Sequence, residues 1–139
     1  MTIDSIKNGY VIDHIKAGKC MYLYNILGLD NLDCPVAIIK NVSSKKLGKK
    51  DIIKIDSMIE LDLEVLGYVD PGLTVNVISD GALVEKKSLS LPKRIKGVIK
   101  CKNPRCITSV EQDLIHEFKL ADEEKSIYRC VFCETKAEN

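Results

Sequence analysis

Four cysteines in the last third of the chain stand in two close pairs, and this spacing is typical of a metal site. Four residues separate Cys101 from Cys106, two separate Cys130 from Cys133, and 23 lie between the pairs. A tight turn can direct two thiolates at one point, and tetrahedral Zn²⁺ is bound by two such turns that face each other. Four sulfur ligands leave no coordination position for water, so the pattern predicts one structural zinc ion without hydrolytic chemistry.

The part of the chain around these cysteines is too short to form a hydrophobic core that is stable without help. We therefore expect metal binding and folding of this part to be one event. Two alternatives stay open: Cys130 and Cys133 could form a redox-active pair, and His116 could be a metal ligand. Four cysteines complete a zinc site without either of them. For the remaining cysteines, Cys20 and Cys34, we expect burial as small apolar side chains.

Few residues elsewhere suggest catalysis. The chain has two histidines and no nucleophile elbow, phosphate-binding glycine loop or paired-carboxylate motif. Asp13 and His14 are neighbours on an expected strand, where adjacent side chains point to opposite faces, so we do not expect a catalytic dyad. Lys50, Lys54 and Lys86 could gather beside them as a site for nucleotide phosphates, with Asp13 accepting from a ribose. The alternative is that these lysines are solvated surface residues.

Apolar spacing and turn signals indicate an α+β fold for the larger, N-terminal part of the chain. In chain order we expect a strand at 10–15, a helix at 17–27, strands at 34–42 and 51–56, a helix at 60–69, and a hairpin of 74–78 and 83–86. This order, with one extra strand, is typical of a ferredoxin-like two-layer sandwich in which two helices cover one face of an antiparallel sheet. The other face must be covered, charged, or used for pairing with another copy.

A second, smaller domain is expected to follow. Pro92 breaks any element near the end of the sandwich, so we predict one domain of residues 1–92 and another of residues 93–139. In the second, apolar and polar residues alternate over 114–120, which predicts a strand, and 127–129 supplies a closing strand. The result is a small all-β zinc ribbon whose hairpin returns the second cysteine pair to the first.

Composition limits the classes of partner. The net charge is +1, with 21 basic and 20 acidic residues, so the chain lacks the global positive field of a dedicated nucleic-acid binder. The longest charge-free apolar stretch, residues 20–29, is too short to span a bilayer, and the first residues lack an export signal. We therefore expect a cytoplasmic protein with neither nucleic acid nor membrane as partner. A nucleic-acid-binding zinc ribbon stays open as the alternative, because six basic residues lead into the first cysteine pair: Lys93, Arg94, Lys96, Lys100, Lys102 and Arg105.

Several short motifs follow one another in a specific order. They are Ile6-Lys7 and Gly9, Val11-Ile-Asp-His-Ile, Gly48-Lys-Lys-Asp-Ile-Ile-Lys-Ile, Thr74-Val-Asn, Ser90-Leu-Pro with Arg94-Ile, and the cysteine quartet. Each motif is weak alone, but the order and spacing together are highly specific. From Ile3 through Cys133, the chain resembles the regulatory chain of aspartate carbamoyltransferase.

This resemblance implies a role in pyrimidine biosynthesis without chemistry of the chain's own. It implies an N-terminal allosteric domain that binds CTP, ATP and, as a third candidate, UTP. It also implies a C-terminal zinc domain that docks on the catalytic chain. We further expect pairing with another copy of the chain as a regulatory dimer.

The resemblance also assigns an effector site, residue by residue. Asp13 and Lys54 would bind the ribose, with Lys54 also reaching the base, while His14 and Lys86 would face the phosphates. The backbone around Ile6 and the Gly81 hairpin would contact the base edge. Further residues would complete the pocket: Ser5, Asn76, Ile78 and Leu83 as its lining, and Lys7 and Lys50 as added positive charge.

Overall fold

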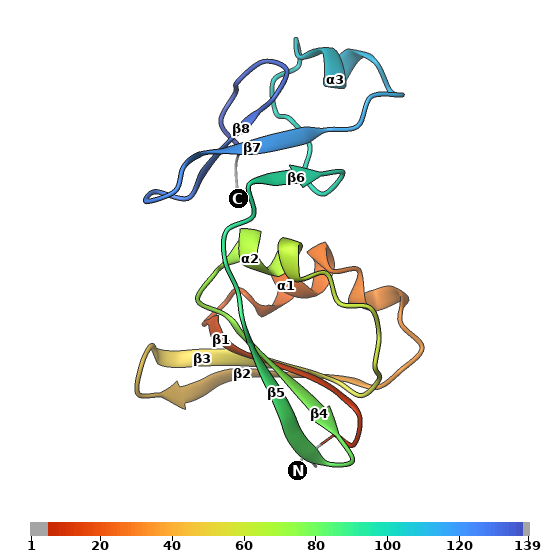
Figure 1. Cartoon of the computed structure of the whole chain (residues 1–139), viewed down its shortest axis with the longest axis vertical. Helices are drawn as coiled ribbons and strands as arrows, with labels where there is room; N and C mark the ends of the chain where they lie inside the picture. The colour runs from red at the N-terminus through yellow and green to blue at the C-terminus, as the bar shows by residue number, and fades with distance from the viewer. Residues whose placement is uncertain (1–5, 138–139) are drawn as a thin grey trace.

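The computed structural model describes residues 6–137, in which a five-stranded sheet is followed by a small three-stranded one (Figure 1). The first sheet is antiparallel, with strand order β2-β3-β1-β4-β5. Its part of the chain contains β1 (Gly9–Lys16), α1 (Cys20–Ile26), the 3-10 turn η1 (Leu29–Asn31), β2 (Val36–Ser44), β3 (Gly48–Ile55), α2 (Leu63–Val69), β4 (Thr74–Ser79) and β5 (Ala82–Ser88). The predicted α+β class and ferredoxin-like order are confirmed. Ser5, predicted to line the pocket, lies outside the described residues.

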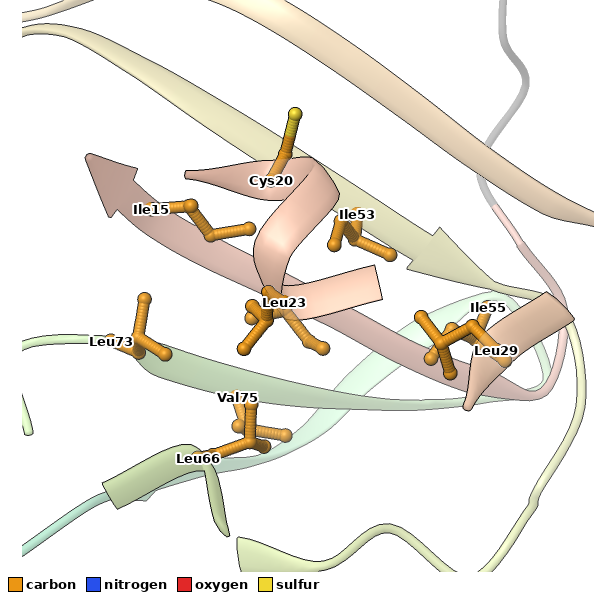
Figure 2. Close-up of a cluster of buried hydrophobic side chains, with 10 residues drawn as sticks. Ile15, Cys20, Leu23, Leu29, Ile53, Ile55, Leu66, Leu73 and Val75 are labelled. Carbon is orange, nitrogen blue, oxygen red and sulfur yellow. The ribbon is translucent and has the colours of Figure 1, made fainter. Parts of the chain in front are cut away.

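The main hydrophobic core lies between this sheet and the two helices. Leu23 of α1 and Leu66 of α2 are buried against Ile15, Ile53 and Val75 on the facing strands (Figure 2). Burying an aliphatic side chain of this size stabilises the fold by about 1.5–3 kcal/mol. The helices therefore leave the opposite face of the sheet open, and they lie between the sheet and the C-terminal module (Figure 1).

The two helices are short and depend on caps and packing. Each has seven residues, a length at which an isolated helix unfolds in water. Asp62 caps α2, because its Oδ1 accepts hydrogen bonds from the backbone N–H groups of Glu64 and Val65 at 3.1 and 3.2 Å. At the start of α1, the backbone nitrogen of Cys20 instead donates to the buried carboxylate of Asp51 at 3.4 Å. No helix within residues 6–137 is long and apolar enough to cross a membrane.

A β-bulge in β1 changes which way two predicted site residues point. β1 advances by three residues from Ile12 to Ile15 while β3 advances by two. Ile12 and Ile15 are both buried in the core, and His14 has a φ of 61°. Asp13 and His14, which lie between them, therefore both reach the open face. The expectation that these neighbours point to opposite faces is wrong, because the bulge interrupts the strand alternation.

A second bulge lies on the other side of β3. β2 advances by three residues from Ile39 to Val42 while β3 again advances by two. Asn41, inside this bulge, has a φ of 60°, a conformation that few residues other than glycine adopt. The two bulges thus flank residues 50–53 of β3 from both sides.

The C-terminal module is built on a small antiparallel sheet with strand order β6-β7-β8. Its elements are β6 (Arg94–Lys96), α3 (Ile107–Val110), β7 (Glu117–Asp122) and β8 (Ile127–Cys130). The small β module with its cysteine group agrees with the predicted zinc ribbon. The strand predicted to start at residue 114 starts at 117, and the sequence patterns predict neither the short strand β6 nor the single helical turn α3.

α2 packs against the C-terminal module. Tyr68 of α2 is buried in the hydrophobic cluster of the C-terminal module, together with Phe118 and Tyr128. The preceding residue, Gly67, lies so close to the connecting chain that a Cβ atom there would be 2.1 Å from the carbonyl oxygen of Ser90. The sandwich and the module therefore share one packed contact.

Candidate functional site

The four cysteine sulfurs predicted as metal ligands lie together. The Sγ atoms of Cys101, Cys106, Cys130 and Cys133 are all within 4.8 Å of one another. Cys101 and Cys133 are 3.5 Å apart at Sγ, and Cys106 and Cys130 are 3.7 Å apart. All four are free thiols. A tetrahedral zinc ion with Zn–S bonds of about 2.3 Å requires sulfurs about 3.8 Å apart, so the group fits this ion.

Neighbouring hydroxyl groups support the sulfur atoms. The Oγ1 atom of Thr108 lies 3.0 Å from the Sγ atom of Cys106, and the Oγ1 atom of Thr135 lies 3.1 Å from that of Cys133. A hydroxyl can donate a hydrogen bond to a thiolate, and partners of this kind orient metal ligands. Each cysteine turn thus has a hydroxyl group that can stabilise the deprotonated, metal-binding form of one cysteine.

The two alternative roles find less support in the geometry. The Nδ1 atom of His116 accepts a hydrogen bond from the backbone N–H of Cys101 at 3.0 Å, so this histidine braces a ligand's backbone. The metal group found among residues 6–137 contains the four cysteines and no histidine. Each sulfur of Cys130 and Cys133 also contacts a cysteine of the other turn, as a shared ion requires and a local redox pair does not.

The surroundings shift the pKa values of the thiols in opposite directions. Burial raises the pKa of the Cys101 thiol to about 12 and also raises that of Cys130. The hydrogen bond with Thr135 lowers the pKa of Cys133 to about 6. Several thiolates at one buried point repel one another, and a divalent cation removes this penalty and holds them deprotonated. A divalent cation bound at this point would therefore stabilise the module.

Predicted nucleotide-binding residues form a row across the open face of the first sheet. Lys54, Val11, Asn76 and Lys86 are successive register partners on β3, β1, β4 and β5. Side chains paired across neighbouring strands share a face, with Cβ atoms about 5 Å apart. Neither Lys54 nor Lys86 forms an ion pair with another residue of 6–137. The row therefore places the Asn76 amide between two lysines, Lys54 and Lys86, that have no ion-pair partner among the described residues.

The amide in this row has an unusual feature. The Oδ1 atom of Asn76 is buried and has no hydrogen-bond partner, the single such side-chain atom in the described part of the chain. An unsatisfied buried acceptor costs about 1–3 kcal/mol, and folded proteins retain few of them. This acceptor lies in the same row as Lys54 and Lys86.

A polar cluster adjoins the row at the bulge of β1. Asp13 Oδ1 accepts hydrogen bonds from Lys50 Nζ at 2.8 Å and from the backbone N–H of His14 at 2.6 Å. The Nδ1 atom of His14 lies 3.1 Å from the Oγ1 atom of Thr74. Burial acts to raise the pKa of Asp13, but the hydrogen bonds from Lys50 and His14 outweigh it and hold the pKa below its usual value. Asp13 is thus a charged, acceptor-only group.

The proposed base end of the site is held together by backbone contacts. Ile78 and Leu83 are register partners on β4 and β5, and Ile6 is 9% exposed. The backbone N–H of Gly81 donates to the carbonyl oxygen of Lys7 at 2.9 Å, so the hairpin lies against the segment before β1. The hairpin residues thus lie next to the segment before β1, and their role in binding stays a prediction.

Sequence reasoning missed two residues of this region, Thr74 and Asp51. The Asp51 carboxylate is completely buried and accepts hydrogen bonds from the backbone N–H groups of Gly18, Cys20 and Asn41. Burial acts to raise the pKa of Asp51, but these hydrogen bonds, together with one from the Cys20 thiol, hold it below its usual value. The only signal in the sequence is a carboxylate at a position where the alternation of β3 requires an apolar residue.

The basic run near the first cysteine pair is partly neutralised. Arg94 and Lys96 both contact Glu117, at 2.7 and 3.7 Å. The hydrogen bond from Arg94 holds the pKa of Glu117 below its usual value. Two of the six cations on which the nucleic-acid alternative depends are therefore already paired within the module.

Comparison with known proteins agrees with the division of the structure into a sandwich and a cysteine-bearing module. Residues 1–90 match the family described as the aspartate carbamoyltransferase regulatory chain, allosteric domain. Residues 93–139 match the family described as the aspartate carbamoyltransferase regulatory chain, metal binding domain. Between them, the two matches cover nearly the whole chain.

Individual relatives are similar over nearly their full lengths. A chain from Clostridium botulinum is 54% identical over 134 residues, which are 96% of this chain and 92% of the relative. One from Clostridium acetobutylicum is 53% identical with the same coverage, and one from Bifidobacterium longum is 43% identical over 99% of both chains. All three carry the name of the regulatory chain and not that of the catalytic chain. This chain therefore belongs to the aspartate carbamoyltransferase regulatory chain family, as a non-catalytic subunit with an allosteric domain and a metal-binding domain.

Proposed function

We propose that this chain binds nucleoside triphosphates on the open face of its first sheet and passes their effect to the catalytic chain of aspartate carbamoyltransferase in pyrimidine biosynthesis. CTP and ATP are the main proposed effectors, with UTP as the third. The proposal depends above all on the unpartnered Asn76 Oδ1 between Lys54 and Lys86. A nucleotide offers both the donors that this oxygen lacks and the phosphates that the lysines attract.

The nucleoside end of the ligand would lie towards the β4–β5 hairpin. Asp13 and Lys54 bind the ribose, the carboxylate as acceptor and the ammonium group as donor, and Lys54 extends to the base. The backbone at Ile6 and near Gly81 contacts the base edge, with Asn76 beside it. The contact between the hairpin and the segment before β1 supports this arrangement, because it brings two backbone segments to the same end of the pocket.

The triphosphate would meet the cationic side chains. His14 and Lys86 face the phosphates, and Lys50 adds positive charge from beside Asp13, to which it is bonded. A hydrogen bond between charged groups contributes about 1.5–3 kcal/mol. Micromolar affinity corresponds to a binding free energy of about 8 kcal/mol. Two or three such contacts, together with those to the ribose and base, suffice for this value.

The C-terminal module would hold one zinc ion and attach the chain to its partner. The ion supplies folding free energy to the module and no chemistry, since Cys101, Cys106, Cys130 and Cys133 fill its coordination positions. Large apolar side chains on α3 and near the cysteine turns are exposed to solvent, which supports docking of this end on the catalytic chain. The exposed residues are Ile107 (48%), Val110 (64%), Ile115 (63%) and Phe132 (48%).

Two further aspects of the proposal concern assembly and compartment. β2 and β5 are the edges of the first sheet and each has one strand neighbour among the described residues. Edge strands offer backbone groups for pairing, which supports association with another copy as a regulatory dimer. All six cysteines are free thiols, in keeping with the reducing cytoplasm, where we place the chain.

The effect on the partner is a coupling free energy, typically about 1–3 kcal/mol. A pyrimidine nucleotide would favour the low-activity state of the assembly and ATP the other state. Each can act only through the difference in its affinity for the two states. The packed contact of Tyr68 with the C-terminal module is a physical connection through which this coupling could pass.

Copurification with a catalytic chain, followed by activity assays, tests the whole proposal. We expect a stable complex whose carbamoyltransferase activity falls with CTP and rises with ATP, while the isolated catalytic chain responds to neither. A complex that forms but shows no response to either nucleotide would disprove the sensing role. A chain that binds nucleotides without forming the complex would disprove the docking role.

A further inference from the structure

The buried carboxylate of Asp51 lies between the two bulges of the first sheet. Its Oδ2 atom accepts from the backbone N–H groups of Gly18 and Cys20 at 3.0 and 3.4 Å. Its Oδ1 atom accepts from the backbone N–H of Asn41 at 3.0 Å. One side chain on β3 is therefore bonded to the chain that follows β1 and to the bulge of β2.

Each of these bonds satisfies a backbone group that the sheet itself leaves free. A bulge removes one residue from the ladder of hydrogen bonds, and Asn41 is in the bulge of β2. Gly18, with a φ of 90°, is in the turn after β1, and Cys20 begins α1. Without an acceptor, these amides would be lost to solvent or left unsatisfied, so Asp51 stabilises the bulge of β2 and the turn that follows the bulged strand β1.

The two bulges fix the position of Lys50 on the open face. Lys50 follows the bulges directly, opposite Lys16 on β1 and Val42 on β2. Removing either bulge would shift the pairing beyond it by one residue, and such a slip turns every following side chain to the other face. The ion pair between Lys50 and Asp13, at 2.8 Å, is formed in the bulged register, and a slip that turned either side chain to the other face would break it.

We propose that Asp51 is the positioning residue of the nucleotide face, holding the bulge of β2 and the turn after β1 so that Asp13, His14 and Lys50 point to one ligand. This inference rests on the proposed function, in which those three side chains meet the nucleotide. Asp51 itself faces the helices and touches no ligand. Its role is to select the backbone conformation in which the open face can bind.

Asp51→Asn in the full, zinc-loaded chain is the first test. The amide group keeps the size of the carboxylate but replaces one acceptor with a donor, so at least one of the three backbone bonds is lost. Titration calorimetry with CTP and with ATP should show an affinity at least about tenfold lower, with zinc content and complex formation unchanged. Ile55→Val, in the core of the same strand and away from the bulges, is the control for lost stability and should keep wild-type affinity.

Two substitutions of exposed Asn41 provide a matched pair should Asp51→Asn fail to fold. Glycine accepts the positive φ of this position, so Asn41→Gly retains the bulge and its N–H group. A β-branched residue strongly disfavours that conformation, so Asn41→Val turns the amide away from Asp51. We expect wild-type affinity for Asn41→Gly and a loss of about tenfold for Asn41→Val.

The outcomes separate this inference from the proposed function. Unchanged nucleotide affinity in both Asp51→Asn and Asn41→Val would overturn the positioning role while leaving the function intact. Should the wild-type chain bind neither nucleotide, the function fails, and hydrogen exchange then decides the inference. Faster exchange confined to the amides around His14 and Lys50 in Asn41→Val would support the role of Asp51, and exchange equal to wild type there would overturn it.

Discussion

Tyr68 of α2 and Tyr128 of β8 meet edge to face, with ring centroids 4.8 Å apart and ring planes at 76°. An aromatic pair in this geometry stabilises a structure by about 0.5–1.5 kcal/mol beyond the effect of its buried area. The Tyr128 hydroxyl also donates to the carbonyl oxygen of Pro92, in the connection between the two parts, at 2.5 Å. Burial raises the pKa of both phenols to about 12, so both stay protonated donors at neutral pH.

Tyr128→Phe should weaken the junction without emptying the core. The ring contact with Tyr68 is retained, but the Pro92 carbonyl loses its donor, so we expect a decrease of about 1 kcal/mol in the free energy of unfolding. Urea denaturation of the zinc-loaded chain measures this decrease. Tyr68→Ala, which removes one ring of the pair and leaves the bond from Tyr128 to Pro92 in place, should cost about 3–5 kcal/mol. Equal losses in the two variants would contradict the larger stabilisation expected from the Tyr68 ring.

Gly67→Ala should destabilise the chain although alanine is the better helix former by about 1 kcal/mol. The new Cβ would lie 2.1 Å from the carbonyl oxygen of Ser90, so the connecting chain has to move. Gly72→Ala is the control, because its Cβ would meet only the side chain of Asp70, at 3.1 Å. A lower melting temperature and weaker nucleotide response are expected for Gly67→Ala alone. A nucleotide response equal to that of wild type would show that the contact between Gly67 and Ser90 plays no part in signal transmission.

Lys86→Ala should weaken nucleotide binding, because it removes one of the two unpaired cations of the row across the open face. A lost charge-assisted contact corresponds to about a tenfold or greater rise in the dissociation constant for CTP. Lys87→Ala is the matched control. Lys87 is next to Lys86 on β5, but it pairs with Val75 of β4 and therefore lies on the opposite face of the sheet. Calorimetry that finds no difference between the two variants would argue against the assigned phosphate site.

Metal removal should unfold the C-terminal module and leave the sandwich folded. Structural zinc sites contribute on the order of 10 kcal/mol or more to folding, whereas the sandwich has its own core around Leu23 and Leu66. Elemental analysis should find one zinc ion per chain, and none in Cys106→Ala, which should also lose the complex with the catalytic chain. Cys34→Ser, outside the metal group, serves as the control. Persistent protection of β6 to β8 amides after chelation would contradict this coupling.

Asp51 should make the stability of the sandwich depend on acid pH. Its folded pKa is below its usual value, so its stabilisation is present above the unfolded pKa of about 3.9 and is lost as pH falls through the folded pKa. The difference in unfolding free energy between wild type and Asp51→Asn should therefore be constant from about pH 7 to 5 and shrink below about pH 4. For Ile55→Val the difference should not change over this range. Urea denaturation at each pH provides the values.

Most of the secondary structure could be predicted from local patterns. The alternation of β3 and the apolar spacing of α1 reflect the same core, in which residues such as Ile53 and Leu23 meet. The cysteine quartet was readable because metal geometry demands short, fixed spacings. These features are encoded by residues near one another in the sequence.

The bulges could not be predicted in this way. His14 and Asn41 adopt a positive φ without being glycines, and what stabilises the bulge at Asn41 is a carboxylate ten residues away on another strand. The strand β6 is similar, because its three residues form a strand only by pairing with β7. Interactions between distant segments decide such features, and they leave little trace in the local pattern.

The helices α1 and α2 lie as a layer between the charged sheet face and the metal module (Figure 1). The proposed nucleotide would therefore exchange with solvent while the module remains attached elsewhere. In that case a long-lived contact and a short-lived one would lie on opposite sides of the helix layer, so the two could have very different lifetimes.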